Sequence, residues 1–144
     1  MRRRVRLALA VGMVGLSAAL LAAGLAAGRA PATASIRSIP IAIHFSRFEL
    51  GSIAARPGET VRFVIRNTDP IDHEFILGDD RVQRIHERGT EAVHPPKPGE
   101  VSVPPGATVE TTYTFGGPGD LTFGCHLPGH FSYGMRGTVA VSDR

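Results

Sequence analysis

The chain has 144 residues, with 16 basic and 13 acidic side chains and a formal net charge of +3. Five of the basic residues and none of the acidic ones lie in the first 34 residues, so the remainder carries 11 positive and 13 negative charges. This balance provides no basic surface for nucleic acid, and we expect no nucleic-acid partner. The remaining length, about 110 residues, is enough for one compact core and too short for two.

Residues 1–34 have the pattern of an export signal, in which an arginine cluster precedes an apolar run over residues 7–28. Small residues precede Ser35, so we expect cleavage there and a mature domain of residues 35–144. Because the apolar run is also long enough to cross a bilayer, an uncleaved membrane anchor is the alternative. In both cases we expect the domain outside the cytoplasm, as a secreted or periplasmic protein or at the outer face of the cell membrane.

Apolar residues alternate with polar ones along several short segments of the mature domain. The positions expected to face inward are Ile39, Ile41, Ile43 and Phe45; Val61, Phe63 and Ile65; Val109, Thr111, Tyr113 and Phe115; Leu121, Phe123 and Cys125; and Val139 and Val141. A period of two is typical of strands, and turns containing Pro and Gly separate the segments. The pattern predicts an all-β fold, an antiparallel sandwich with one apolar face per sheet. His44 falls on a polar face, so we expect it to be exposed.

The segment of residues 78–99 lacks this alternation and is long for a connection in a small domain. Asp80 followed by Gln83 resembles a capping box and Gly89 suits a helix end, which predicts one short helix over residues 81–88. The segment also carries His86, Glu87, Glu91 and His94. These side chains offer a second, weaker metal site or a docking surface for a partner, and a solvated loop is the alternative.

Cys125 is the single cysteine of the chain, so it has no internal disulfide partner. A buried, inert thiol is the simplest interpretation, but His130 and Met135 follow it, each after four intervening residues. Thiolate, imidazole and thioether together favour copper over magnesium or calcium. A trigonal copper site with a weak axial Met needs one more imidazole, and His73 is the best placed candidate, with a core histidine bonded to a carbonyl as the alternative. We therefore predict one copper ion held by His73, Cys125, His130 and Met135.

These residues resemble the plastocyanin/azurin-type cupredoxins over essentially the whole mature domain. The resemblance runs from residues 58–63 and 67–69, before His73, to the Cys-His-Met loop and the last strand. It implies a Greek-key β-sandwich or barrel with a mononuclear type 1, or blue, copper centre near one end. It also implies that the ring of His130 reaches the surface through an apolar patch and serves as the electron port. The patch candidates are Leu127, Pro128 and Phe131, with ordinary loop packing as the alternative.

Two departures from the family pattern bear on the site. The spacing from His130 to Met135 is more similar to that of rusticyanin than to that of plastocyanin. Many relatives place Asn directly after the upstream His, where it helps to tie the ligand segments together, whereas this chain has Glu74.

His126 directly follows Cys125, and multicopper oxidases have a His at this position and another directly before the cysteine. In this chain Gly124 stands before the cysteine, and only one copper domain is predicted. We expect His126 to face outward or to pack within the loop.

The predicted function is that of an exported one-electron carrier with one Cu(I)/Cu(II) ion. The alternative is a copper-binding protein for copper delivery, buffering or resistance. We expect no enzymatic activity, because the sequence offers no catalytic triad, no paired carboxylates and no open metal position. The expected partner is a redox protein or a copper-handling protein, the expected state is a monomer, and membrane contact is expected only through an uncleaved N-terminal segment.

Overall fold

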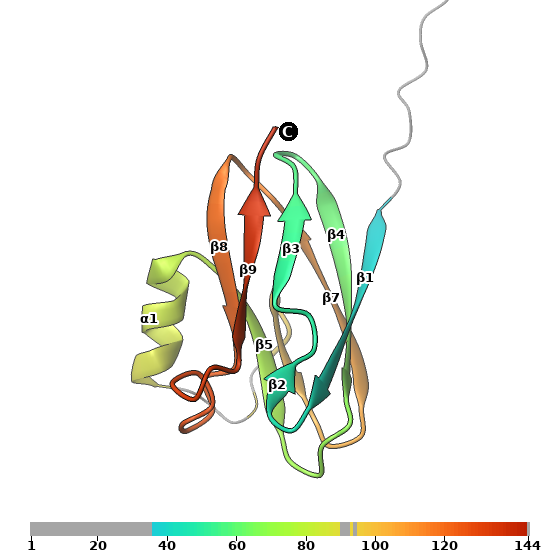
Figure 1. The fold of residues 1–144 in the computed structure, drawn as a ribbon, viewed down its shortest axis with the longest axis vertical. Helices are drawn as coiled ribbons and strands as arrows, with labels where there is room; N and C mark the ends of the chain where they lie inside the picture. Colours follow the sequence, from blue (N-terminus) through green and yellow to red (C-terminus); the bar gives the residue numbers. More distant parts are fainter. Residues whose placement is uncertain (1–35, 90–92, 94, 144) are drawn as a thin grey trace, which may run out of the picture. The chain divides into compact units, whose positions relative to one another are not determined.

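The computed structural model describes residues 36–143 apart from 90–92 and 94, and they form two packed β-sheets (Figure 1). The first sheet contains, in order across it, β2 (Arg47–Phe48), β1 (Arg37–His44), β4 (Thr60–Asn67) and β7 (Thr108–Thr114). The second contains β3 (Ser52–Ala55), β9 (Arg136–Val141), β8 (Gly119–Gly124), β5 (His73–Gly78) and β6 (Glu100–Val103). The predicted β-sandwich is therefore confirmed, whereas the predicted export signal lies outside the described residues.

Two strand pairs are parallel, although the alternation predicted an antiparallel sandwich. β1 pairs with β4, and β3 pairs with β9. Between β1 and β4 the chain crosses to the other sheet to form β3, and parallel neighbours require such a crossover. Half-buried strands alternate in both arrangements, so the sequence pattern did not distinguish them.

Inward-facing side chains of both sheets form one hydrophobic core. Its fully buried aromatic members are Phe63, Phe75, Phe115 and Phe123. The rings of Phe75 and Phe123 stack with centroids 5.4 Å apart, and burying such a side chain contributes about 1.5–3 kcal/mol. Phe45 was predicted to face inward but is 82% exposed, because β1 ends at His44 and a φ of 49° turns Phe45 out of the strand. The His44 side chain is exposed, as predicted.

Helix α1 (Asp80–Arg88) lies beside the sandwich and packs against β5 and β8 (Figure 1). The predicted short helix is confirmed, but the capping box is wrong. Asp79 is the N-cap, and its Oδ1 accepts a hydrogen bond from the Val82 amide at 2.9 Å. Gln83 does not return to the cap, since its side chain is buried against the sheet. By covering the outer face of β5, α1 leaves every residue of that strand buried.

The loop that joins β4 to β5 and the loop that joins β8 to β9 lie at the same end of the sandwich, the lower end in Figure 1. The start of β1 and the C-terminus lie at the opposite end. His73 begins β5, and the other three predicted ligands lie between β8 and β9. The fold therefore carries all four predicted ligands to one end of the domain.

Candidate metal centre

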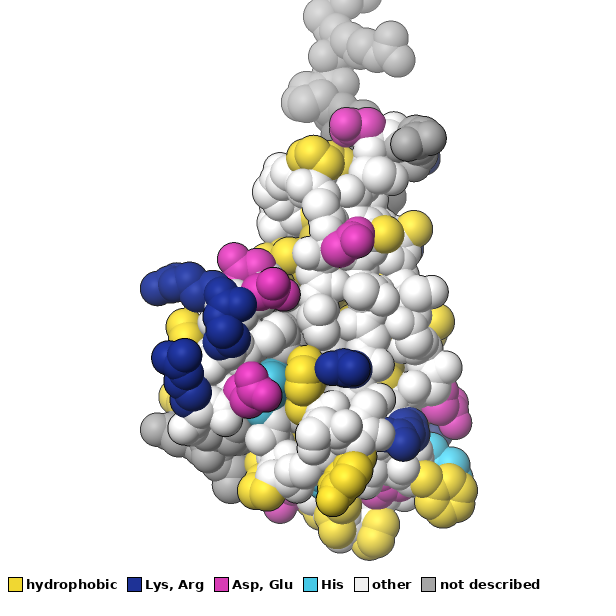
Figure 2. All heavy atoms as spheres, turned by 60° about the vertical axis from the view of Figure 1, so that its left-hand side comes forward, with side chains coloured by type: hydrophobic (Ala, Val, Ile, Leu, Met, Phe, Trp, Pro, Cys, Tyr) yellow, Lys and Arg dark blue, Asp and Glu magenta, His cyan; other side chains and the backbone are white. Residues whose placement is uncertain are grey.

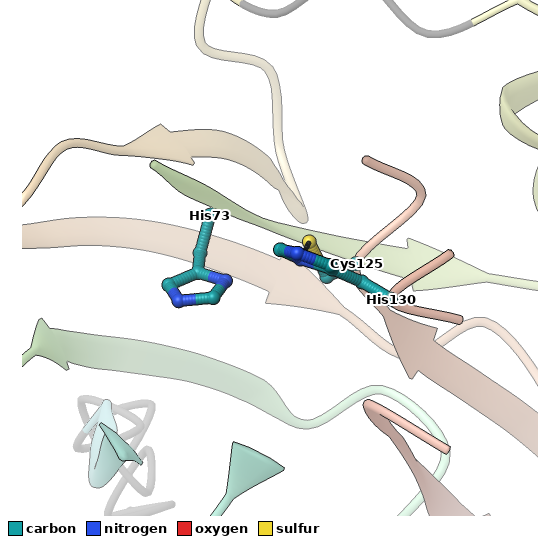
Figure 3. A group of neighbouring side chains, drawn as sticks. All are labelled: His73, Cys125 and His130. Carbon is teal, nitrogen blue, oxygen red and sulfur yellow. Dashed lines mark hydrogen bonds between the residues drawn. The ribbon is translucent and has the colours of Figure 1, made fainter. Parts of the chain in front are cut away.

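Three of the four predicted ligands meet at the lower end of the sandwich and point toward one another (Figure 3). One ligand atom each from His73, Cys125 and His130 lies within 4.8 Å of the other two. His130 Nδ1 is 3.2 Å from Cys125 Sγ. His73 and Cys125 are fully buried, whereas His130 is partly exposed. Two segments far apart in the sequence thus supply a compact set of two imidazoles and one sulfur.

Asp69 sets the orientation of the His73 ring. His73 Nε2 donates a hydrogen bond to Asp69 Oδ2 at 3.0 Å. His73 Nδ1 is buried and has no hydrogen-bond partner among the described residues. Because Nε2 carries the proton, Nδ1 keeps its lone pair and is the nitrogen available to a metal. The alternative of a core histidine bonded to a carbonyl is wrong, since the partner is a carboxylate and the second nitrogen is unsatisfied.

Hydrogen bonds from three directions hold Asp69 in place. Asn67 Oδ1 accepts from the Asp69 amide at 2.9 Å, while Asn67 Nδ2 donates to three backbone carbonyls. The amides of Phe45 and Ser46 donate to the Asp69 carboxylate at 2.8 and 2.7 Å. Burial opposes the ionisation of Asp69, but the bonds from Ser46, Phe45 and His73 outweigh it and lower the pKa of the carboxyl group. Asp69 is therefore a charged, strong acceptor at neutral pH.

Backbone hydrogen bonds close the β8–β9 loop and place Met135 beside Cys125. The Cys125 amide donates to the Met135 carbonyl at 3.1 Å, and the Met135 amide donates to the His130 carbonyl at 2.9 Å. Gly129 and Gly134 take φ values of 85° and 92°, a left-handed conformation that glycine adopts without strain. The Met135 side chain is fully buried. Its role as the axial ligand stays a prediction.

Burial has opposite effects on the two titratable ligands of this loop. Burial raises the pKa of the Cys125 thiol, and hydrogen bonds from the backbone at Glu74 and Leu127 offset this rise only in part, so the resulting pKa is about 11. Burial lowers the pKa of His130, and the neighbouring His73 lowers it further. At neutral pH the His130 imidazole is therefore neutral, with a lone pair available. The Cys125 thiol is protonated and must lose its proton to bind a metal.

Glu74 joins the two ligand segments. It is fully buried, and its Oε1 accepts a hydrogen bond from the His126 amide at 2.7 Å. This bond connects the residue after His73 to the residue after Cys125. Glu74 thus makes the connection that Asn is expected to make at this position in related proteins.

His126 packs within the loop rather than facing outward. Its side chain lies beneath α1, with Nε2 2.7 Å from Gln83 Oε1. Its ring stacks on Phe131 with centroids 4.4 Å apart. Burial, together with the nearby His86, lowers the pKa of His126 to about 4, so the ring is neutral at pH 7.

His130 borders a surface groove of about 440 Å³, whose other lining residues are Phe45, Ser46, Arg47, Pro128 and Tyr133. Phe45 and Tyr133 are 82% and 78% exposed, and Figure 2 shows hydrophobic side chains gathered at this lower end. Of the predicted patch residues, Pro128 lines the groove. Leu127 packs against the core instead, and Phe131 stacks on His126. The exposure of Phe45 was not predicted, because Phe45 continues the apolar alternation of the preceding strand. No sequence pattern identified Tyr133 as a surface residue.

The predicted second metal site is only partly described. His86 Nδ1 lies 3.0 Å from the Val82 carbonyl, and His86 Nε2 lies 3.5 Å from Glu100 Oε2. His94 and Glu91 are outside the described residues, so this site stays a prediction. Within residues 36–89, 93 and 95–143, the group of His73, Cys125 and His130 is the one in which three such donors come close enough to share an ion.

The donor set of this group suits copper, since a sulfur and two neutral imidazole nitrogens are ligands that copper prefers. The lone pair of His73 Nδ1 faces a buried site with no hydrogen-bond donor to satisfy it, which fits a metal ligand. Residues 41–142 match the family of copper-binding proteins described as the plastocyanin/azurin family. The chain belongs to this family. The predicted resemblance to cupredoxins and the predicted copper cofactor are both confirmed.

Several relatives of this cupredoxin are named for copper resistance. The copper-resistant cuproprotein CopI of Rubrivivax gelatinosus is 41% identical over 98 residues, which cover 66% of this chain and 59% of that protein. CopI of Pseudomonas aeruginosa is 31% identical over 145 residues, which cover 78% of this chain and 80% of that protein. Auracyanin-B of Chloroflexus aurantiacus is 26% identical over 123 residues, with 76% of this chain and 52% of that protein covered.

Solved structures of auracyanins share the fold of this cupredoxin. Auracyanin B superposes with a TM-score of 0.61 at 23% identity, covering 74% of this chain and 88% of its own. The dithionite-reduced auracyanin of Roseiflexus castenholzii has a TM-score of 0.61 at 22% identity and covers 73% of this chain and 96% of its own. At this level of identity the likeness establishes the fold alone, and the Greek-key cupredoxin architecture is confirmed.

Proposed function

We propose that this cupredoxin is a one-electron carrier in which His73, Cys125, His130 and Met135 hold a single type 1 copper ion. The observation that carries the proposal is the preformed donor cluster, in which His73 Nδ1, Cys125 Sγ and His130 Nδ1 converge at the end of a rigid sandwich. Copper held by such a set alternates between Cu(I) and Cu(II), and thereby takes up or releases one electron.

The chain around the cluster supports electron transfer because it resists rearrangement. Asp69 holds the His73 ring, and backbone bonds fix Cys125 to Met135 and Met135 to His130. Ligands that stay in place when the metal changes its charge keep the cost of reorganisation low. The partly exposed His130 and the groove of Phe45, Pro128 and Tyr133 offer a route to a redox partner at the surface.

The test is to load the purified protein with Cu(II), record its visible spectrum and titrate it with a reductant. An intense thiolate-to-copper band that bleaches and returns reversibly is the expected result. Tight Cu(II) binding without this band would contradict the proposed ligand set, and a band that could not be cycled would contradict electron transfer.

A second candidate is copper delivery, buffering or resistance, which the names of the CopI relatives favour. In such a role the protein must take up and release the copper ion itself, whereas an electron carrier keeps its copper through many redox cycles. Release of Cu(I) and Cu(II) to a chelator distinguishes the two. If bound copper leaves the protein with a half-life much shorter than the time taken by repeated cycles of reduction and reoxidation, copper handling is favoured.

We further propose that the protein works outside the cytoplasm as a non-enzymatic monomer, after cleavage before Ser35 or anchored through residues 7–28. Among the described residues no helix is long and apolar enough to cross a membrane. Mass spectrometry of the natural protein is expected to find an N-terminus at or near Ser35. Retention of residues 7–28 in a membrane fraction would establish the anchor instead, and a soluble full-length cytoplasmic protein would contradict both.

A further inference from the structure

Helix α1 is hydrogen-bonded to the copper loop through Gln83, and the ring of His86 on the same helix lies 5.9 Å from the His126 ring. Although Gln83 belongs to a surface helix, it is only 6% exposed. Its Nε2 lies 2.8 Å from the Thr122 carbonyl and 3.3 and 3.4 Å from the carbonyls of Ile76 and Gly78. These carbonyls belong to β5 and β8, the strands that carry the two ligand segments. The amide nitrogen of Gln83 is therefore committed to the sheet.

The orientation of the Gln83 amide determines what its oxygen can do. With the nitrogen facing carbonyl groups, Oε1 faces His126 Nε2 at 2.7 Å. An amide oxygen only accepts, so His126 Nε2 must carry the proton and donate it to this bond. The His126 ring also stacks on Phe131 with an interplanar angle of 14°, which restricts its orientation. The Gln83 amide thus makes a hydrogen bond of defined direction to the residue directly after Cys125.

From His126 the connection continues to the other ligand segment. The His126 amide donates to Glu74 Oε1 at 2.7 Å, and Glu74 directly follows His73. Gln83, His126 and Glu74 are all buried, with exposed fractions of 6%, 7% and 0%. Hydrogen bonds shielded from water in this way are stronger and more directional than surface ones. A continuous chain of bonds therefore runs from α1 past Cys125 to His73.

We infer that Gln83 is a positioning residue of the copper site: through its bond to His126 it fixes the Cys125 segment relative to the His73 segment. The inference rests on the proposed copper ligands and concerns a residue 42 positions away from Cys125 in the sequence. It assigns a role to the segment between β5 and β6, whose helix docks against the ligand strands. Copper binding and α1 docking are then coupled, so each stabilises the other by the same factor.

The sharpest test breaks the bond between helix and loop without touching a ligand. His126→Phe keeps a ring to stack on Phe131 and leaves the bonds of Gln83 to the sheet in place, but it cannot donate to Gln83 Oε1. We expect release of Cu(II) to a chelator to become about tenfold faster, the lower end of the effect of losing a hydrogen bond to a ligand itself, because His126 is adjacent to a ligand. The thiolate-to-copper band and the reduction potential should shift as well, which a loss of fold stability alone would not produce.

Two further variants complete the test. Gln83→Met has a similar volume and removes the bond from the helix side, so it should also speed copper release. The double variant should release copper no faster than Gln83→Met alone, because both changes remove the same bond. Arg84→Ala is the control: Arg84 is the next residue of α1, its side chain is 59% exposed, and we expect the wild-type spectrum and release rate.

A release rate, band and potential of His126→Phe equal to those of Arg84→Ala would overturn the inference. So would multiplicative effects of the two single changes in the double variant. Hydrogen exchange of the α1 amides gives a readout that does not depend on redox activity, and copper loading should slow it in the wild type but not in His126→Phe. If the wild-type protein itself shows no reversible coloured site, the proposed function fails; if it does and the variants match the control, only the role of Gln83 fails.

Discussion

Asp69 Oδ2 accepts a hydrogen bond from His73 Nε2 at 3.0 Å, and both side chains are buried. The same carboxylate accepts the amides of Phe45 and Ser46, which adopt left-handed φ values of 49° and 52°. Successive amides in this conformation form a concave anion site, here occupied by a side chain of the protein. The β1–β2 turn thereby determines which nitrogen of His73 is offered to copper.

We expect Asp69→Ala to weaken copper binding by about 10- to 100-fold, the usual consequence of losing the hydrogen-bond partner of a metal-bound histidine. It should also destabilise the copper-free protein by about 1–3 kcal/mol, because the partly buried amides of Phe45 and Ser46 lose their acceptor. Competition with a chelator and urea denaturation measure the two effects. Asp72→Asn is the matched control, since Asp72 is exposed although it directly precedes His73. Equal copper affinities for the two variants would contradict this role of Asp69.

Cys125→Ser should abolish the coloured copper site while the sandwich still folds. The thiolate is the charge-transfer partner of the copper, whereas the core consists of side chains from both sheets. Burying a hydroxyl in place of the thiol should cost about 1–3 kcal/mol, which a domain of this size can tolerate. Visible absorption and far-ultraviolet circular dichroism measure colour and fold separately. Full colour in this variant would refute the ligand assignment.

The raised pKa of Cys125, about 11, predicts how the copper-free protein responds to alkali. Because this value lies above the ordinary thiol value of 9.0, folding favours the protonated thiol. The resulting stability is fully present below pH 9 and is lost as the pH rises through about 11. At pH 10.5 the loss should be about 2 kcal/mol. The measurement is urea denaturation at pH 8 and pH 10.5.

Cys125→Ser serves as the reference for this pH dependence, since other groups also titrate in alkali. The wild type should lose more stability than the variant between the two pH values, and equal losses would show that the thiol is not perturbed. Copper binding at pH 7 should release the thiol proton, so calorimetry in two buffers of different ionisation enthalpy should find about one proton more for the wild type than for Cys125→Ser.

Local sequence signals predicted the strands well, and they selected three side chains, His73, Cys125 and His130, that the structure brings together. Ile39, Ile41 and Ile43 alternate because one face of β1 is buried, and the spacing of Cys125, His130 and Met135 reflects one closed loop. At a turn, however, the alternation no longer predicts which side chains are buried. Phe45 continues the apolar alternation, yet the turn that delivers its amide to Asp69 exposes its ring.

The residues behind the ligands could not be predicted because their partners are distant in sequence. The bond of Gln83 to His126 spans 43 positions and that of His126 to Glu74 spans 52. Gln83 also fitted a capping box, so the sequence offered a local explanation for this residue and gave no reason to expect its hydrogen bonds to the sheet and to His126. Asp69 lies four residues before His73, and this spacing was the one local signal that could have identified it.

Met135→Leu should retain copper and raise the reduction potential. Met135 is fully buried, and leucine fills nearly the same volume without a sulfur. The axial bond of a type 1 site is long and weak, so its loss should change the electronic balance between Cu(I) and Cu(II) more than the affinity. Protein-film voltammetry gives the potential, and the ratio of copper to protein gives the occupancy. Complete loss of copper from Met135→Leu would show that the predicted geometry is wrong.

The groove beside His130 should control electron exchange without affecting the copper itself. Phe45 and Tyr133 are 82% and 78% exposed and line this groove with His130, so two copies can approach through it. We expect Tyr133→Asp to slow electron self-exchange between oxidised and reduced protein by about tenfold, because a charge must be desolvated at the contact. Ile85→Asp is the control, since Ile85 is 54% exposed on α1 and gives the same change in net charge. NMR line broadening in mixtures of the two oxidation states measures the rate. The visible spectra of both variants should match the wild type, and equal slowing by both would mean that net charge, rather than this groove, governs the exchange.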